Sequence, residues 1–296
     1  MPVDFLVRPM TAEDVRAVER LTDEAFWDLM VRTHRPGWPE RERHDEARAH
    51  DGRARAQHLM GSDPRGCWVA EDDHGVLGAA LSMKRDLTWL LASFAVRAGF
   101  QGRGVGRPLL DAALTYGSGC LRGMIAASED PRAIRRYRLA GFTLHPTMVL
   151  RGPVPRETLP VVERVREGSA GDIDLMNSVD RQVRDAAHGV DHELLTRGHR
   201  LVVADRATGS GYAYLAPDGG PYLLAATNRR TATDLLWEVL AASSPDTSVS
   251  VPHITAANEW AIDVGMVCRL ELWTDGYLAL RGMRPPLPYL HSGYFL

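Results

Sequence analysis

The chain has 296 residues, with 35 Lys and Arg against 38 Asp and Glu, which gives a formal net charge of −3. This balance excludes a general nucleic-acid binder, whose surface is usually basic, and ordinary fractions of hydrophobic (45%) and charged (25%) residues exclude a disordered or collagen-like chain. The three cysteines form no Cys-x-x-Cys pair, so neither a disulfide framework nor a zinc knuckle is predicted.

The first half of the chain is predicted to alternate strands and helices. Thr11 and the acidic residues after it are typical of a helix start, and the nearly continuous apolar run at residues 87–96 is typical of a buried central strand. The expected strands are residues 5–8, 67–70, 76–83, 87–96, 121–126 and 142–150, and the expected helices are residues 11–25, 39–59, 108–114 and 131–139.

The second half repeats this order after a segment, residues 151–160, that holds three prolines. Gly141-Phe142 and Gly265-Met266 follow short helices at what we take to be equivalent places, which indicates an internal duplication. The expected strands are residues 201–204, 211–215, 221–226, 249–251 and 268–273, and the expected helices start near Ser169 and span residues 231–242 and 257–264.

The most informative segment is a glycine-rich loop between the apolar strand and the next helix. Its core reads Gln101-Gly102-Arg103-Gly104-Val105-Gly106. Glycines allow a tight turn with exposed N–H groups, and the helix start adds its positive dipole end, so the loop is suited to a pyrophosphate. It lacks the Gly-Lys-[Ser/Thr] of a P-loop and the G-x-G-x-x-G of a dinucleotide site. The alternative is a plain flexible connector.

Preceded by an apolar strand that ends in valine, this loop resembles the [Gln/Arg]-x-x-Gly-x-[Gly/Ala] acyl-CoA loop of the GNAT superfamily of N-acyltransferases. The resemblance extends over residues 1–150 in the order of elements. It implies an α/β (α+β mixed sheet) fold of two GNAT-like domains, each a central, mostly antiparallel twisted sheet flanked by helices. It also implies acetyl-CoA as cosubstrate. Pantetheine would contact Ala95 and Val96, and the pyrophosphate would be held by Gln101, Gly102, Arg103, Gly104, Val105 and Gly106.

A second motif lies downstream, at residues 130–142. It is similar to the family's Asn-x-x-Ala-x-x-x-Tyr-x-x-x-Gly-Phe, with Asp130 where asparagine is usual and with Tyr137 at the tyrosine. The resemblance assigns Asp130 to cofactor binding and makes Tyr137 the general acid that protonates the departing CoA thiolate. The alternative for Tyr137 is a packed helix tyrosine with a surface hydroxyl.

A general base is harder to assign, because the strand at residues 87–96 holds no carboxylate. Glu71, Asp72 and Glu129 lie at strand ends, where acidic residues are usually just solvated. Ser93 could order a water molecule. The other candidate is the C-terminal carboxylate of Leu296, which we expect the apolar tail to bring near Tyr137. The alternative is a tail that only packs.

The second half is expected to lack the chemistry of the first. Residues 226–232 hold no glycine at the loop position, and counting back from Gly265 places Ala261 where Tyr137 would be. We therefore expect a catalytic domain at residues 1–152, a linker at 153–161, a degenerate GNAT-like domain at 162–284 and a C-terminal tail at 285–296. His188 and His192 are spaced like metal ligands, but without a supporting motif we expect surface histidines and no metal.

These observations predict an acetyl-CoA-dependent N-acetyltransferase that transfers an acyl group directly to an amine. The acceptor is a small-molecule or protein amine, without nucleic acid or membrane as partner, and a homodimer is left open. We expect a cytoplasmic protein, because no apolar run approaches the roughly 20 residues of a membrane span. The alternative is a non-catalytic acyl-CoA-binding sensor or regulatory module, which the missing strand carboxylate favours.

Overall fold

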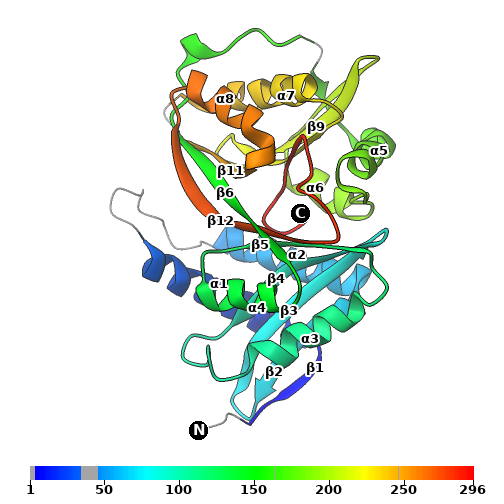
Figure 1. Ribbon diagram of the computed structural model, residues 1–296, viewed down its shortest axis with the longest axis vertical. Coiled ribbons are helices and arrows are strands. Elements are labelled where there is room, and N and C mark those ends of the chain that lie inside the picture. Colours follow the sequence, from blue (N-terminus) through cyan, green and yellow to red (C-terminus); the bar gives the residue numbers. More distant parts are fainter. Residues whose placement is uncertain (1–3, 35–45, 164, 246) are drawn as a thin grey trace. The chain divides into compact units, whose positions relative to one another are not determined.

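The computed structural model describes residues 4–34, 46–163, 165–245 and 247–296 (Figure 1). Helices and strands alternate along the chain, which confirms the predicted α/β class. The chain divides into two compact units. The first comprises residues 1–84, 89–121 and 129–140, and the second comprises residues 85–88, 122–128 and 141–296.

In the first unit, four strands follow one another in the order β1-β2-β3-β4, and the first three pair antiparallel. Val15, Val18, Leu21 and Ala25 recur at helical spacing and are buried on one face of α1, as predicted. The expected second helix begins later, and residues 39–45 lie outside the described part. The elements are β1 (Leu6–Pro9), η1 (Ala12–Asp14), α1 (Val15–Thr33), α2 (Glu46–Ser62), η2 (Pro64–Gly66), β2 (Cys67–Asp72), β3 (Gly75–Arg85), β4 (Thr88–Val96), α3 (Gly106–Tyr116) and α4 (Pro131–Leu139).

In the second unit, one run of strands has the order β5-β12-β6-β11 and a separate sheet has the order β13-β10-β9-β8-β7. Helix α7 packs on β8, β9 and β10 around a core of aliphatic side chains. The elements are β5 (Arg122–Ala127), β6 (Thr143–Gly152), η3 (Arg156–Thr158), β7 (Arg166–Glu167), η4 (Ala170–Asp172), α5 (Ile173–Arg184), α6 (Asp191–Gly198), β8 (Leu201–Arg206), β9 (Gly209–Leu215), β10 (Pro221–Ala226), α7 (Arg229–Ala241), β11 (Val249–Thr255), η5 (Ala256–Asn258), α8 (Glu259–Val267), β12 (Glu271–Arg281) and β13 (Tyr289–Leu290).

Strand β12 lies between β5 and β6, a pairing that hydrophobic periodicity does not reveal. Leu278 of β12 faces Ala126 of β5 on one side and His145 of β6 on the other. On its far side β6 pairs with β11, so the last expected strand of the first half joins strands of the second half (Figure 1). The compact units therefore divide the chain differently from the expected segments 1–152 and 162–284, and those domain boundaries stay a prediction.

The same ion-paired turn occurs in each of the two units. In the first unit, Arg8 Nη1 and Nη2 donate to the two oxygens of Asp14 at 2.7 and 2.9 Å. In the second, Arg166 Nη1 and Nη2 donate to Asp172 at 3.1 and 2.5 Å. The bound guanidinium holds the pKa of each carboxyl below its usual value, although burial opposes this. This shared Arg-to-Asp clamp supports the internal duplication.

The equivalence of the two short helices needs a correction. Helices α4 and α8 have the same length, and the residue with positive φ that follows is Gly141 (88°) in one case and Arg269 (57°) in the other. Gly141-Phe142 therefore corresponds to Arg269-Leu270 and not to Gly265-Met266. Gly265, not Ala261, stands at the place of Tyr137. The sequence count failed because Gly265 lies inside α8, where it gives room to Leu150.

In the described residues, none of the helices combines the length and the apolar character that crossing a membrane requires.

Candidate active site

The glycine-rich loop leads from the end of β4 to the first turn of α3. Gly99, Gly102 and Gly104 have φ values of 85°, 79° and 97°, a region that side chains disfavour and glycine adopts freely. In the described part of the chain, the amide N–H groups of Gly102 and Gly104 donate to no protein acceptor. With the exposed start of α3 next to them, these amides can receive an anion.

The rest of the loop is fixed by contacts to the strand. Gln101 Nε2 donates to the carbonyl oxygen of Val96 at 2.9 Å, so this side chain closes the loop onto β4. Val105 is buried, and a Cβ on Gly106 would lie 3.3 Å from the ring of Phe94. The predicted pyrophosphate contacts of Gln101 to Gly106 and the pantetheine contacts of Ala95 and Val96 stay predictions, now with the backbone geometry that they need.

Tyr137 lies in α4 and is only 4% exposed. Its ring contacts that of Phe94 on β4, with 6.2 Å between the centroids. Burial, together with the negative charge of Asp130, raises the pKa of the phenol. The hydroxyl has no hydrogen-bond partner among the described residues. A phenol that stays protonated and uncommitted can donate its proton to a leaving group, as the predicted general acid must.

Asp130 serves as the N-cap of α4. Its Oδ1 accepts from the amide of Arg132 at 2.8 Å, and both carboxylate oxygens accept from the Arg132 guanidinium. Burial opposes ionisation, but these bonds and the charge of Arg32 outweigh it and hold the pKa of Asp130 below its usual value. The carboxylate is thus engaged in helix capping, and its predicted cofactor contact stays a prediction.

Among the candidate bases, Ser93 stands out. Its Oγ is buried and has no hydrogen-bond partner in the part of the chain that the structure describes. Glu71 is paired with Arg8 at 2.6 Å, and Asp72 accepts the amide of His74 in the β2–β3 turn, so both have structural contacts. The role of Ser93 in ordering a water molecule stays a prediction.

The tail at residues 285–296 packs within the second unit. Tyr289, Leu290 and Phe295 are at most 2% exposed, as their apolar character predicts. Leu296 is fully buried, and Arg184 Nη1 donates to its backbone oxygen. Tyr137 belongs to the first unit and Leu296 to the second, so the predicted approach of the Leu296 carboxylate to Tyr137 stays a prediction.

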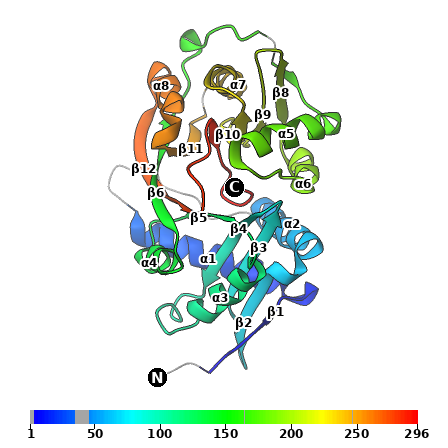
Figure 2. The same cartoon turned by 45° about the vertical axis from the view of Figure 1, so that its right-hand side comes forward.

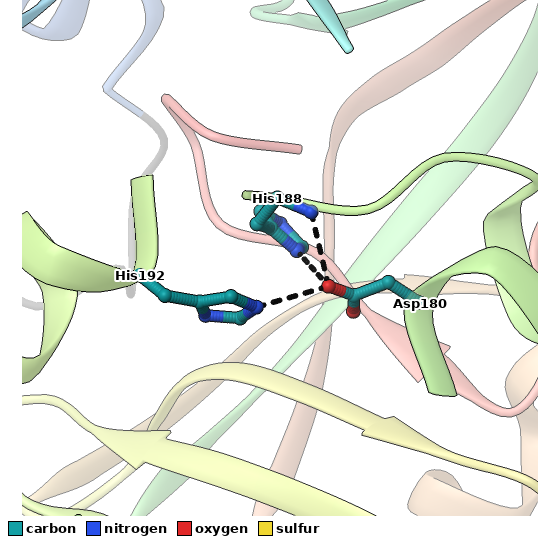
Figure 3. Close-up of side chains that lie close together, drawn as sticks. All are labelled: Asp180, His188 and His192. Carbon is teal, nitrogen blue, oxygen red and sulfur yellow. Dashed lines mark hydrogen bonds and ion pairs between the residues drawn. The ribbon is translucent and has the colours of Figure 1, made fainter. Parts of the chain in front are cut away.

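His188 and His192 are not surface residues, contrary to the expectation from the sequence. Both are fully buried, and they meet the fully buried Asp180 (Figure 3). Asp180 Oδ2 lies 2.8 Å from His188 Nδ1 and 3.1 Å from His192 Nε2, and Tyr212 donates to Oδ1 at 2.5 Å. The side chains cluster because a loop, not one continuous helix, joins α5 to α6.

The three ligand-type side chains lie as close together as the ligands of a metal site. Every ring nitrogen nevertheless has a protein partner: Tyr214 lies 3.1 Å from His192 Nδ1, and Tyr289 lies 3.4 Å from His188 Nε2. The amide of His188 also donates to Asp180 Oδ2. Burial and the charge of Arg184 lower the pKa of His188 to about 4, so a neutral His188 takes part in this hydrogen-bonded network. We assign it no metal.

Sequence reasoning missed this network and the aromatic neighbour of Tyr137. The tyrosines at positions 212 and 214 of β9 were a usable signal, because buried hydroxyls need partners. Phe94 could have been marked because it directly precedes Ala95 and Val96, the predicted pantetheine contacts at the end of β4.

Comparison with known proteins finds a family model that covers both the glycine loop and Tyr137. Residues 24–142 match the model of the acetyltransferase (GNAT) family. No curated protein matches the chain. A putative acetyltransferase from Pyrococcus horikoshii has a similar fold, with a TM-score of 0.72 and 15% identity over 98% of this chain and 95% of that one.

A GCN5-related N-acetyltransferase from Sphaerobacter thermophilus has a TM-score of 0.58 with 14% identity over 99% of this chain and 100% of that one. One from Kribbella flavida has a TM-score of 0.55 with 16% identity over 94% and 72%. At these identities the likeness concerns the fold. Residues 24–142 thus match the acetyltransferase (GNAT) family model, and over nearly its whole length the chain has the fold of these acetyltransferases.

Proposed function

We propose that the chain is an acetyl-CoA-dependent N-acetyltransferase that transfers the acyl group directly to an amine of a small molecule or a protein. The observation that carries this proposal is the loop at residues 97–105. Its glycines have positive φ, two amides have no protein acceptor in the described part, and the start of α3 follows directly. This arrangement supports a site for the pyrophosphate of an acyl-CoA.

The end of β4 leads toward this loop. Ala95 and Val96 are the two residues before it, so an acyl-CoA whose pyrophosphate sits at Gly102 to Gly106 would run its pantetheine arm along them. The carbonyl oxygen of Val96 accepts a hydrogen bond from Gln101 Nε2, which keeps the loop next to the strand end. The arm would then place its thioester near Phe94 and Tyr137, whose rings are in contact.

The reaction needs one proton to leave the amine and one to reach the thiolate. The amine nitrogen attacks the thioester carbon, the N–C bond forms and the C–S bond breaks. Tyr137 gives its proton to the departing sulfur, and its raised pKa keeps it protonated until then. The proton lost by the amine passes to water and restores the phenol, so the sum is an amide and free CoA.

A water molecule held by Ser93 is the proposed proton acceptor. Ser93 Oγ is buried without a protein partner in the described residues, so it can bind that water. The Leu296 carboxylate is the second candidate. Its oxygen is bonded to the Arg184 guanidinium, which stabilises the charged form and makes a weaker base.

Release of free thiol from acetyl-CoA tests the reaction. The purified chain would be incubated with acetyl-CoA and a panel of small amines, amino acids and peptides, and CoA binding would be measured in parallel. Thiol release that depends on one class of amine supports the proposal. Tight CoA binding without turnover across the panel would instead support the sensor alternative. Absence of CoA binding would reject both.

A further inference from the structure

We propose that Phe94 is a positioning residue for the transfer reaction: its ring fixes the Tyr137 phenol relative to the first turn of α3, so that the proton donor faces the thioester of a bound acyl-CoA. The inference rests on the proposed function and concerns residues of the first unit alone. Phe94 has no ionisable group, so it acts on the reaction through Tyr137.

The Tyr137 phenol is held by packing. Tyr137 is 4% exposed, yet its hydroxyl has no hydrogen-bond partner among the described residues. The buried phenol of Tyr212 differs, because its hydroxyl donates to Asp180 at 2.5 Å. A phenol without a hydrogen bond takes its direction from the groups that contact its ring. For Tyr137 the aromatic neighbour is Phe94, with 6.2 Å between the ring centroids and 59° between the ring planes.

Gly106 makes room for the same ring. It is the first residue of α3 and has helical backbone, so the positive φ of the loop glycines does not explain a glycine at this position. A Cβ on Gly106 would lie 3.3 Å from Cζ of Phe94 and 3.6 Å from Cγ2 of Val96. The missing side chain therefore lets the first turn of α3 lie directly against the ring of Phe94.

The ring of Phe94 thus lies where three elements of the first unit meet. Phe94 comes from β4, Gly106 from α3 and Tyr137 from α4, and all three elements are labelled in Figure 2. Phe94 and Val96 are two residues apart on β4 and both approach Gly106, so they share one face of the strand. An acyl-CoA with its pyrophosphate at the start of α3 and its pantetheine along Ala95 and Val96 would bring its thioester to this ring.

An aromatic ring at this place suits the task of positioning a proton donor. It is rigid, so it fixes the spacing between the start of α3 and the phenol. It carries no hydrogen-bonding group, so it leaves the phenol proton of Tyr137 free for the departing sulfur. Proton transfer depends steeply on the placement of the donor, and a misplacement of about 1 Å can cost about 100-fold in rate.

Steady-state kinetics of Phe94→Leu, measured in the wild-type and in the Tyr137→Phe background, test this role. Leucine keeps an apolar side chain on β4 and removes the ring. At saturating acetyl-CoA and amine, kcat should fall about 10-fold or more in the wild-type background, while the Kd for CoA changes by less than about 2-fold. In the Tyr137→Phe background kcat should change by less than about 2-fold, because no proton donor is left to place.

Gly106→Ala disturbs the same ring from the side of α3. Its methyl group would lie 3.3 Å from Phe94 Cζ, so the ring must shift by a few tenths of an ångström. At saturating acetyl-CoA, kcat should fall about 3-fold or more in the wild-type background and by less than about 2-fold in the Tyr137→Phe background. Thermal unfolding checks that each variant is folded, and Gly106→Ala decides the question if Phe94→Leu is not.

Phe142→Leu is the matched control, because Phe142 also packs on a glycine: its Cε1 lies 3.0 Å from a Cβ placed on Gly123, within the second unit. It should keep the wild-type kcat. Equal losses of kcat from Phe94→Leu in the two backgrounds would overturn the inference, because the ring would then act without Tyr137. Absence of amine-dependent thiol release in the wild type would reject the proposed function, and the inference with it.

Discussion

The two halves of the molecule share a framework and differ at one connection. In the first half, residues 97–105 join β4 to α3 through three glycines with positive φ. In the second, only residues 227–228 join β10 to α7, and Asn228 caps the helix by accepting the amide of Thr231 at 2.9 Å. In the first half, amides of this connection can therefore face an anion. In the second half, an amide at the helix start is instead bonded to the capping side chain of Asn228.

The framework itself is the part that both halves keep. Arg8 with Asp14 and Arg166 with Asp172 form the same clamp, and Asp130 and Asn258 stand at the starts of equal helices. Asp130 precedes the helix with Tyr137, whereas Asn258 binds the tail. The comparison indicates that both halves keep the Arg–Asp ion pairs and the helix N-caps that support the fold. We expect that one loop and a few side chains decide which ligand each half binds.

The largest effect is expected at the position where the halves differ chemically, Tyr137. Tyr137→Phe should lower kcat by about 100-fold or more and leave CoA affinity unchanged, because only a proton donor is lost. Steady-state kinetics and calorimetry check both values. Tyr116→Phe is the control, because the Tyr116 hydroxyl bonds to Asp63, and it should keep kcat. An unchanged kcat in Tyr137→Phe would make this residue structural.

The raised pKa of Tyr137 predicts how kcat depends on pH on the alkaline side. Because burial raises the pKa of Tyr137 above its ordinary value of about 10, the phenol stays protonated as pH rises to that value. The kcat of the wild type should therefore not fall between pH 8 and about 10 through loss of this proton. A falling limb in that range that Tyr137→Phe abolishes would contradict the assignment.

A smaller loss is expected when the loop of the first half is made to resemble that of the second. Gly104→Val places a β-branched residue at φ 97° and crowds the free amides, so the Kd for CoA should rise about 10-fold or more. Gly75→Val is the matched control, because Gly75 has φ 117° in the β2–β3 turn and also faces open space. Equal CoA affinity in both variants would remove the loop from the site.

A substitution in the second half, at the position that corresponds to Tyr137, should change the stability of the protein and leave CoA binding unaltered. A Cβ on Gly265 would lie 2.3 Å from Leu150 Cδ1 in a buried core, so Gly265→Ala should destabilise by about 1–3 kcal/mol without altering CoA binding. Gly61→Ala, also in a helix but with open space around it, should be neutral or stabilising. Equilibrium unfolding compares the two, and an unchanged stability of Gly265→Ala would contradict the role of Gly265 in making room for Leu150.

The smallest effect is expected at Asp130. Asparagine caps helices as well as aspartate, so Asp130→Asn should cost at most about 1 kcal/mol at pH 7, mainly the half-exposed pairing with Arg132. Because the folded pKa is lowered, this contribution is present above the unfolded pKa and is lost as pH falls through the folded value. The two proteins should therefore become equally stable in acid, and a gap that widens there would contradict this.

The sequence predicted what depends on local order. The buried face of α1, the apolar strand β4 and the glycine loop all follow from spacing and from backbone preference, and their positions were correct to within a few residues. The match of the loop and of Tyr137 to two motifs of one family was also visible without a structure. These features need no knowledge of which distant segments meet.

The rest depends on contacts between residues far apart in the chain. The place of β12 between β5 and β6, and the burial of His188 and His192 against Asp180 and Tyr212, cannot be read from periodicity. Gly265 misled the count because its role is to make room for Leu150, not to end a helix. Side-chain packing decides such cases, and a single sequence does not encode it locally.

The claim that the two halves diverged at their ligand sites is tested most directly by the number of CoA molecules that one chain binds. Isothermal titration calorimetry of the full chain with acetyl-CoA measures this number. We predict one per chain, bound at the loop of residues 97–105, because the second half has a capped turn in place of the loop and holds the tail along β10. A stoichiometry of two, or one that Gly104→Val leaves intact, would contradict the account.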